Sequence, residues 1–269
     1  GSWGGGAGAA GGAPGRAGSA KRSRPAPPGA AGGHGGSSTA PGGSGGAVVV
    51  RAGTGGVKVL FSTGFDPALI AKYTAQIEKL NGSVTQDSTD FTHFLTAFPL
   101  NRSKSMLCAL ATGRPVVGET WLKASNGART FVPWEDHLVR HAKFESKHQF
   151  DLPSTLEAAR NSPLLAGVRV HVVTPQGART HPAASAGAML EVLLPLAGAV
   201  MASAADLRGA AAEALEGDGW LVLATQDSSE AEVKRLVARG VPVHGHEMVL
   251  AGIVQHKLDR KSSHKIKSR

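Results

Sequence analysis

The sequence predicts an α/β protein with two similar domains in tandem, each a small, mostly parallel sheet covered by helices. Two observations indicate this fold. Short apolar, β-branched runs alternate with segments of helical periodicity, in the order strand, helix, strand, strand, helix, strand, helix. The same kind of order begins again about 110 residues later, when residue 57 is compared with residue 168.

The first repeat begins with a short apolar strand at residues 57–61. Asp66 and Pro67 are typical of a helix start, since an N-cap residue is followed by proline at the first helical position. That helix is expected to stop at Asn81-Gly82. Further strands are expected at 83–85, 92–96 and 113–117, and further helices at 103–111 and 119–124.

A connector of residues 126–165 follows, and its apolar face predicts a helix at 152–159. The Ala-rich, Gly-punctuated stretch 203–218 is expected to be a long loop with some helix. The second repeat has strands expected at 168–173, 198–201, 220–224 and 241–243, and helices at 184–196, 230–238 and 247–255.

The composition is uneven along the chain of 269 residues. Residues 1–56 hold 21 of the 36 glycines and no Asp or Glu, so this tail cannot bury enough apolar surface to fold and is expected to be disordered. The net charge of +9 comes from the two basic ends, which together carry +10 and leave −1 for residues 57–256. A near-neutral folded part argues against general nucleic-acid binding, so weak nucleic-acid contact or nuclear import is left to the basic tails.

Several classes of function are excluded or unsupported. One cysteine excludes a disulfide framework and a Cys-based zinc site, and Cys108, like Trp121, is expected in the core. The histidine pairs 137/141 and 244/246 lack a third ligand at typical spacing, so we expect surface histidines and no metal. No paired carboxylates or nucleophile elbow support an enzyme, and no apolar run of about 18 residues predicts a membrane span. Without an initiator Met, the chain is expected to be part of a longer one.

The run Gly113-Arg114-Pro115-Val116-Val117 followed by Trp121 resembles the hallmark of the BRCT domain family, a glycine turn, a strand and a helix that buries a tryptophan. In the second repeat, residues 247–254 resemble the last helix of tandem BRCT pairs, and the connector motif of Phe150 and Leu152 is also similar to theirs. The resemblance implies two BRCT-like domains, each a four-stranded parallel sheet flanked by about three helices, packed through a linker helix. The domains expected are 57–140 and 166–258, with a linker at 141–165, the tail 1–56 and a basic tail at 259–269.

The resemblance also implies phosphopeptide binding. Tandem BRCT pairs hold a phosphoserine in the first domain and the residue three positions later in a groove between the domains. The family's first donor group, a hydroxyl with a following backbone N–H after the first strand, matches Ser62-Thr63-Gly64. Whether Ser62 or Thr63 supplies the hydroxyl stays open, and a plain helix-capping loop is the structural alternative.

The second donor group of the family, a Thr-x-Lys at the start of the second helix, matches Ser103 and its neighbours. Here Ser105 stands where the family has lysine, and Lys104 comes one residue early, which is about 100° around a helix. Its side chain is long enough to curl back, so Lys104 joins Ser62, Thr63, Gly64 and Ser103 as an expected phosphate-binding residue. Arg102 matches the family arginine that contacts the backbone or carboxylate near the third residue. A simple N-cap for Ser103 and a solvated surface position for Lys104 are the structural alternatives.

The expected function is therefore a phosphoserine-peptide-binding adaptor of the DNA-damage response, located in the nucleus and needing no cofactor. Its expected partner is a phosphorylated histone tail or repair factor. The alternative is a BRCT scaffold that binds a partner without phosphate or binds DNA ends. The displaced lysine motivates this alternative, whereas the near-neutral folded part argues against its DNA form.

Overall fold

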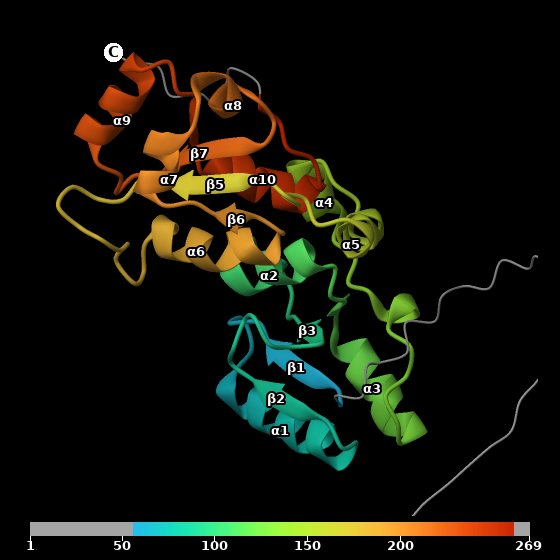
Figure 1. Cartoon of the computed structure of the whole chain (residues 1–269). Helices are drawn as coiled ribbons and strands as arrows, with labels where there is room; N and C mark the ends of the chain where they lie inside the picture. The colour runs from blue at the N-terminus through green and yellow to red at the C-terminus, as the bar shows by residue number, and fades with distance from the viewer. Residues whose placement is uncertain (1–55, 261–269) are drawn as a thin grey trace, which may run out of the picture. The chain divides into compact units, whose positions relative to one another are not determined.

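The computed structural model describes residues 56–260, so the predictions for the N-terminal tail up to residue 55 and for residues 261–269 lie outside it. It contains two four-stranded sheets in which every strand pair is parallel (Figure 1). The first sheet has the order β2-β1-β3-β4, with β1 at Lys58–Phe61, β2 at Ser83–Thr85, β3 at His93–Leu95 and β4 at Val116–Val117. The second has the order β6-β5-β7-β8, with β5 at Arg169–Val172, β6 at Val200–Met201, β7 at Trp220–Ala224 and β8 at Val243–Gly245.

The helices confirm the predicted α/β order. In the first repeat they are α1 at Pro67–Lys79, α2 at Lys104–Thr112 and α3 at Glu119–Ala128. The connector holds a 3-10 turn at Glu135–His137, α4 at Ala142–His148 and α5 at Leu152–Asn161. The second repeat has α6 at Ala186–Leu196, α7 at Ala204–Gly209, α8 at Ala212–Glu216, α9 at Glu230–Ala238 and α10 at Glu247–Gln255.

Two details differ from the sequence prediction. The connector contains the additional helix α4, whereas the stretch 203–218 contains the short helices α7 and α8, as a loop with some helix predicts. The last strand begins at Val243 because the N–H of Val241 still donates to Leu236 O of α9 at 3.1 Å, and Pro242 has no N–H for a ladder. The predicted domain boundaries stay predictions.

Trp121 is fully buried, as expected, at the centre of the first repeat. Its ring stacks between His93, with centroids 4.7 Å apart, and Phe131, at 5.5 Å. Its indole N–H donates to Val132 O at 3.0 Å. The tryptophan of the Gly-to-Trp motif thus ties β3 to α3 and to the start of the connector, which explains why a smaller residue would leave a cavity there.

Burial lowers the pKa of His93 from 6.5 to about 4. The unfolded chain therefore takes up a proton here between pH 6.5 and 4 while the folded chain does not, so the free energy of unfolding falls as the pH falls through this window. The expected loss is about 3 kcal/mol at pH 4. Urea unfolding at pH 7, 5.5 and 4 measures it. The variant His93→Phe, which keeps a ring beside Trp121, should show a flatter pH dependence; an unchanged slope would contradict the assignment.

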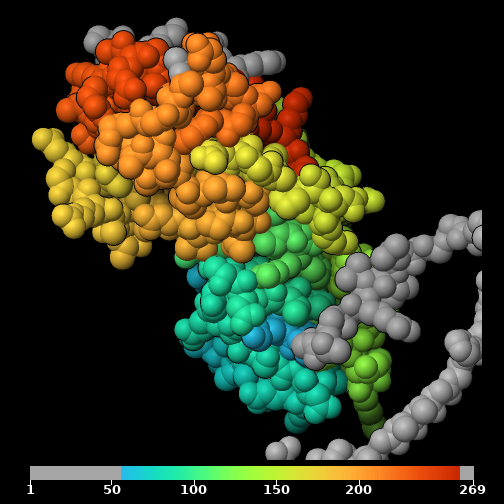
Figure 2. Space-filling model, in the orientation of Figure 1, coloured from blue at the N-terminus to red at the C-terminus, as the bar shows by residue number. Residues whose placement is uncertain are grey.

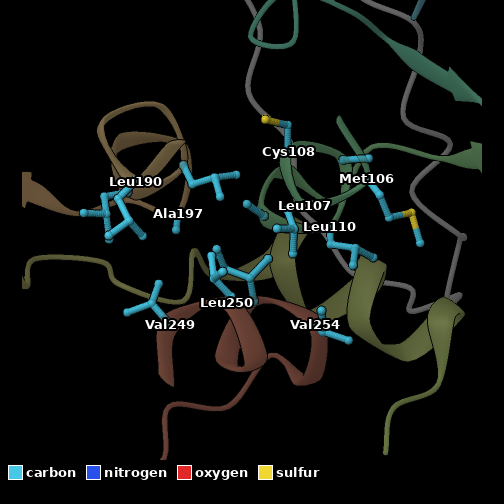
Figure 3. Close-up of a cluster of buried hydrophobic side chains, with 14 of the residues drawn as sticks. Met106, Leu107, Cys108, Leu110, Leu190, Ala197, Val249, Leu250 and Val254 are labelled. Atoms are coloured by element: carbon cyan, nitrogen blue, oxygen red, sulfur yellow. The ribbon is translucent and has the colours of Figure 1, made fainter. Parts of the chain in front are cut away.

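The two repeats share one apolar core centred on α2. In the close-up, Leu107 and Leu110 of α2 lie next to Leu250 of α10 (Figure 3). Met106 and Cys108 of α2 and Leu190 of α6 belong to the same apolar cluster. The space-filling view shows the residues around α2, in green, directly against those of α6, in orange (Figure 2). Cys108 is buried as predicted, and burial raises the pKa of its thiol. Apolar burial on this scale is the main force that holds two domains in a fixed arrangement.

Between residues 56 and 260, no helix has both the length and the apolar character to cross a membrane. The same part of the chain contains no cluster of three or more His, Cys, Asp or Glu side chains that could bind a metal ion. The expectation of surface histidines is wrong for His244, which is buried in the middle of β8.

Candidate functional site

The topology of the first sheet creates a switch point between β1 and β3. These two strands are neighbours, but β1 continues through α1 to β2 on one side, whereas β3 continues through α2 to β4 on the other. All strands are parallel, so the carboxyl ends of β1 and β3 meet at the same edge. In open α/β sheets, ligands bind in the crevice at such an edge.

Ser62 follows β1 at this edge and contacts the residues that follow β3. Its N–H donates to Leu95 O at 2.9 Å, and its Oγ accepts from the N–H of Ala97 at 3.1 Å. The residue is only 7% exposed. Because Oγ acts as an acceptor here, the hydroxyl proton is still available to donate to a ligand oxygen.

Thr63 and Gly64 form an exposed turn directly after Ser62. Within residues 56–260, no hydrogen bond uses the backbone N–H of either residue. A Cβ added to Gly64 would lie 3.7 Å from Ala97 Cβ and 3.8 Å from Ser62 Oγ, so this turn packs against the same corner. The turn therefore presents two backbone donors and the Thr63 hydroxyl beside the Ser62 hydroxyl.

Ser103 is the N-cap of α2, as predicted. Its backbone is extended, and its Oγ accepts from the N–H of Met106 at 3.3 Å, which leaves its hydroxyl proton available. The N–H groups of Lys104 and Ser105, in the first turn of α2, have no partner within the helix. A helix start with free N–H groups and a positive dipole end favours an anion.

Lys104 is exposed and lies on the flank of α2 that faces the loop after β2. The N–H and hydroxyl of Thr89 hold the pKa of Asp87 below its usual value, and Lys104 and Lys58 add to this effect. Lys104 thus lies near enough to Asp87 to influence its pKa. Ser105, one residue further on, brings no charge at the position where the resemblance implies lysine.

Arg102 reaches from the start of α2 to the second repeat. Its Nη2 donates to Glu247 Oε2, in the first turn of α10, at 2.7 Å. His148, at the end of α4, lies near both: burial lowers its pKa, Arg102 and Lys147 lower it further, and Glu247 opposes them. Arg102 therefore lies between the repeats, where the resemblance expected it. Its partners were missed, because residues 145 positions apart leave no local signal.

The structure thus brings Ser62, Thr63 and Gly64 to one corner and puts Ser103 and Lys104 on the helix that starts from the same edge. Among the described residues, no hydrogen bond joins the side chains of Ser62 and Ser103 to each other or to Arg102. The corner is held instead by the hydrogen bond from Ala97 N–H to Ser62 Oγ. Sequence reasoning missed it because a backbone donor leaves no trace in residue identity.

At the equivalent corner of the second repeat, hydroxyl and backbone groups already form hydrogen bonds with one another. Ser228 Oγ donates to Val173 O at 2.6 Å and accepts from the N–H of Thr225 at 2.9 Å. The N–H of Ser229 donates to Thr174 O at 2.9 Å. The first turn of α9 is also acidic, with Glu230 and Glu232. The helix start at the first switch point carries no acidic side chain, whereas the one at the second carries two, so an anion is favoured at the first.

Residues 56–126 match the sequence model of the BRCA1 C Terminus (BRCT) domain. The structure is similar to the crystal structure of the S. pombe Brc1 BRCT5-BRCT6 domains, with a TM-score of 0.56 and 16% identity over 76% of this chain and 94% of that one. The first repeat is therefore a BRCT domain, and the two repeats together have the fold of a tandem BRCT pair.

The chain also matches two curated proteins by sequence. The chain is 26% identical to PAX-interacting protein 1 of Mus musculus over 205 residues, which cover 76% of this chain and 19% of that protein. It is 30% identical to Mediator of DNA damage checkpoint protein 1 of Homo sapiens over 115 residues, 43% of this chain and 5% of that protein. The chain spans about a fifth or less of the length of these relatives.

Proposed function

We propose that this chain is a phosphoserine-peptide-binding module of a DNA-damage-response adaptor. The observation that carries the proposal is the corner at the β1/β3 switch point. There, the hydroxyls of Ser62 and Ser103 each accept a backbone N–H and so keep their own protons for a ligand. The free N–H groups of Thr63 and Gly64 and of the first turn of α2 add further donors. A phosphate has the acceptor oxygens that such a set of donors requires.

The recognition has two points. The phosphate binds at the corner, and Arg102 contacts a carbonyl or carboxylate of the peptide further along. Arg102 is already oriented toward the space between the repeats by its ion pair with Glu247. A ligand oxygen therefore has to share or displace that carboxylate, which favours peptides that also gain energy at the corner. Two separated contacts give more sequence selectivity than the phosphate alone.

The similarity to PAX-interacting protein 1 and Mediator of DNA damage checkpoint protein 1 supports the adaptor role. It also supports a location in the nucleus and a partner that is a phosphorylated repair factor or histone tail. The same likeness supports binding rather than catalysis as the activity of the chain.

One observation favours the second candidate, a BRCT scaffold that binds its partner without phosphate. Ser105 supplies no cation, and Lys104 lies beside Asp87. A dianionic phosphate at this corner is therefore met by hydroxyls and N–H groups and by less positive charge than the family resemblance implies. Hydrogen bonds from charged donors contribute roughly 1.5–3 kcal/mol each, so the loss of one is a large fraction of a weak affinity.

The test is a titration of the full chain with a labelled peptide whose phosphoserine is followed by three residues and a free carboxylate. We expect the phosphorylated peptide to bind at least tenfold more tightly than the unphosphorylated one, since charge-assisted hydrogen bonds account for the difference. Ser103→Ala should weaken phosphopeptide binding about tenfold, because it removes one such donor.

Ser229→Ala is the matched control. Ser229 caps α9 as Ser103 caps α2, with its Oγ accepting from Glu232 N at 3.3 Å. Both variants lose a cap worth about 1 kcal/mol of stability, but only Ser103 faces the open corner. Equal affinities for the two peptides, or equal effects of the two variants, would contradict phosphate recognition and favour the phosphate-independent scaffold.

A further inference from the structure

A hollow with a volume of about 410 Å³ opens on the surface of the second repeat. Its lining includes Arg169 of β5, Trp220 of β7 and small residues of the segment that holds α7 and α8, namely Ala205, Gly209, Ala210 and Ala214. Arg169 and Trp220 are the first residues of their strands, so the hollow lies at the amino edge of the second sheet, opposite the edge where its strands end. It shares no residue with the candidate phosphopeptide site.

The segment that forms one side of this hollow has no counterpart in the first repeat. There, residues 86–92 are enough to connect β2 to β3, whereas residues 202–219 connect β6 to β7 and hold α7 and α8. The hollow therefore belongs to an addition that is specific to the second repeat. Longer connections of this kind are often the places where a fold carries an extra contact.

The polar groups of the hollow are already engaged. The guanidinium carbon of Arg169 lies 5.8 Å from the centroid of the Trp220 ring. Asp206, also in the lining, accepts from the N–H and the hydroxyl of Ser203 at 2.8 and 2.6 Å, and the charge of Arg169 acts on it as well. Val200 of β6 pairs with Arg169 and is 53% exposed, which adds apolar surface beside the hollow. The surface left to cover suits an apolar side chain.

The segment around the hollow carries an excess of negative charge. Glu213 and Glu216 of α8 are exposed, and so is Asp218, which follows them. Within residues 56–260, neither glutamate forms an ion pair, and Asp218 has one with Arg260 at 3.5 Å. Charge complementarity therefore favours an occupant whose apolar side chain is flanked by cations.

Arg260 fixes the end of the described chain beside the hollow. Its Nη1 donates to Gly217 O and to Trp220 O, both at 3.1 Å, and its Nη2 donates to Asp218 O at 2.7 Å. Since Trp220 lines the hollow, residue 261 follows within a short distance of it.

Residues 261–269 have the chemistry that the hollow calls for. This segment has no Asp or Glu, and its one large apolar residue, Ile266, stands between Lys265 and Lys267. Ile266 comes six positions after Arg260, a stretch that can span about 20 Å when extended, so it can reach the hollow.

We propose that residues 261–269 bind the hollow of their own chain, with Ile266 against Trp220 and the small residues, and with the neighbouring lysines toward Glu213 and Glu216. Because the segment is tethered through Arg260, its effective concentration at the hollow is on the order of millimolar, so a weak contact is enough to keep it bound. The bound lysines are then held by the acidic rim and are less available to nucleic acid. This inference does not depend on phosphopeptide binding.

The experiment compares amide NMR spectra of the full chain and its variant Ile266→Ser. We expect the substitution to shift the signals of Gly209, Ala210, Ala214 and the Trp220 indole, although it lies far from them in the sequence. Adding about 1 mM of a free peptide with the sequence of residues 261–269 should move these signals back, since the free peptide then matches the effective concentration of the tether. The same peptide with serine in place of the isoleucine should not.

Ser263→Ala is the matched control in the same segment and should leave the signals of the hollow unchanged. The double variant Glu213→Lys, Glu216→Lys should reduce the shift caused by Ile266→Ser, because its rim repels the lysines, whereas Glu157→Lys on α5 should not. Unchanged signals in Ile266→Ser, or equal shifts in Ser263→Ala, would overturn the proposal. So would a shift that disappears on about tenfold dilution, since only binding between two copies depends on concentration.

Discussion

Ser105→Lys is expected to tighten phosphoserine-peptide binding about tenfold. Ser105 is the second residue of α2, and its N–H is among the free donors at the helix start. An ammonium group at this position can reach a phosphate held between Ser62 and Ser103, and it adds a charge-assisted hydrogen bond. The affinity should also fall more steeply with added salt than it does for the natural chain, since one more charge contributes.

Lys104→Ala belongs in the same titration. Lys104 is exposed, and the contribution of an exposed charge is weakened by solvent, so we expect its removal to weaken binding less than threefold. Combining Lys104→Ala with Ser105→Lys moves the cation by one position at constant net charge. That double variant should bind more tightly than the natural chain.

Ala231→Lys provides the matched control for the added charge. Ala231 is the second residue of α9, at the place in the second repeat that corresponds to Ser105. The added lysine there faces a corner already closed by Ser228 and Ser229, so it should leave phosphopeptide affinity unchanged. Equal gains from Ala231→Lys and Ser105→Lys would mean that net charge alone drives binding. A large loss from Lys104→Ala would assign the family lysine's role to Lys104.

Gly113→Ala is expected to destabilise the protein by about 3 kcal/mol or more. Gly113 ends α2 with a φ of +64°, and a Cβ there would lie 2.5 Å from Arg160 Cγ, 2.6 Å from Leu156 O and 2.8 Å from Arg160 N. Two of these atoms belong to the backbone of α5 and cannot move away cheaply. The substitution therefore adds left-handed strain and also separates α2 from α5 at the shared core.

Gly167→Ala separates the cost of the left-handed backbone from the cost of the steric contact with α5. Gly167 also has a left-handed φ, +76°, but a Cβ there meets nothing within 4 Å. Its substitution should lower the free energy of unfolding by about 1 kcal/mol, the cost of the backbone conformation alone. Urea unfolding of both variants measures the difference. If Gly113→Ala were no more destabilising than Gly167→Ala, the close approach of α5 would not limit the residue at 113.

Some features of the site follow from the sequence because they depend on neighbouring residues. The caps at Asp66 and Ser103 are examples. In each, a short polar side chain accepts a hydrogen bond from an N–H two or three residues away, so the cap can be recognised from the local sequence. The resemblance of residues 113–121 to BRCT domains rests on the same kind of short-range pattern. The phosphate-binding role of Ser62, Thr63, Gly64, Ser103 and Lys104, and the role of Arg102 in contacting the peptide further along, remain predictions.

The burial of α2 could be predicted only in part from the local sequence pattern. The spacing predicts an inner face with Met106, Leu107 and Leu110, yet Ala109 and Ala111 are buried as well. A helix that packs against a sheet has one apolar face, but α2 also contacts α5, α6 and α10. Those partners come from the connector and the second repeat, so the burial of the outer face depends on where distant segments meet.

The sequence by itself determined the α/β order of two repeats, the helix starts at Asp66 and Ser103, and the burial of Trp121 and Cys108. Each of these follows from side chains that interact within a few residues or from apolar periodicity. Only the tertiary structure decided that Ser62 is held by Ala97 and that Arg102 pairs with Glu247. These contacts join residues 35 to 145 positions apart, or backbone groups common to all residues, so they exist only once the chain has folded.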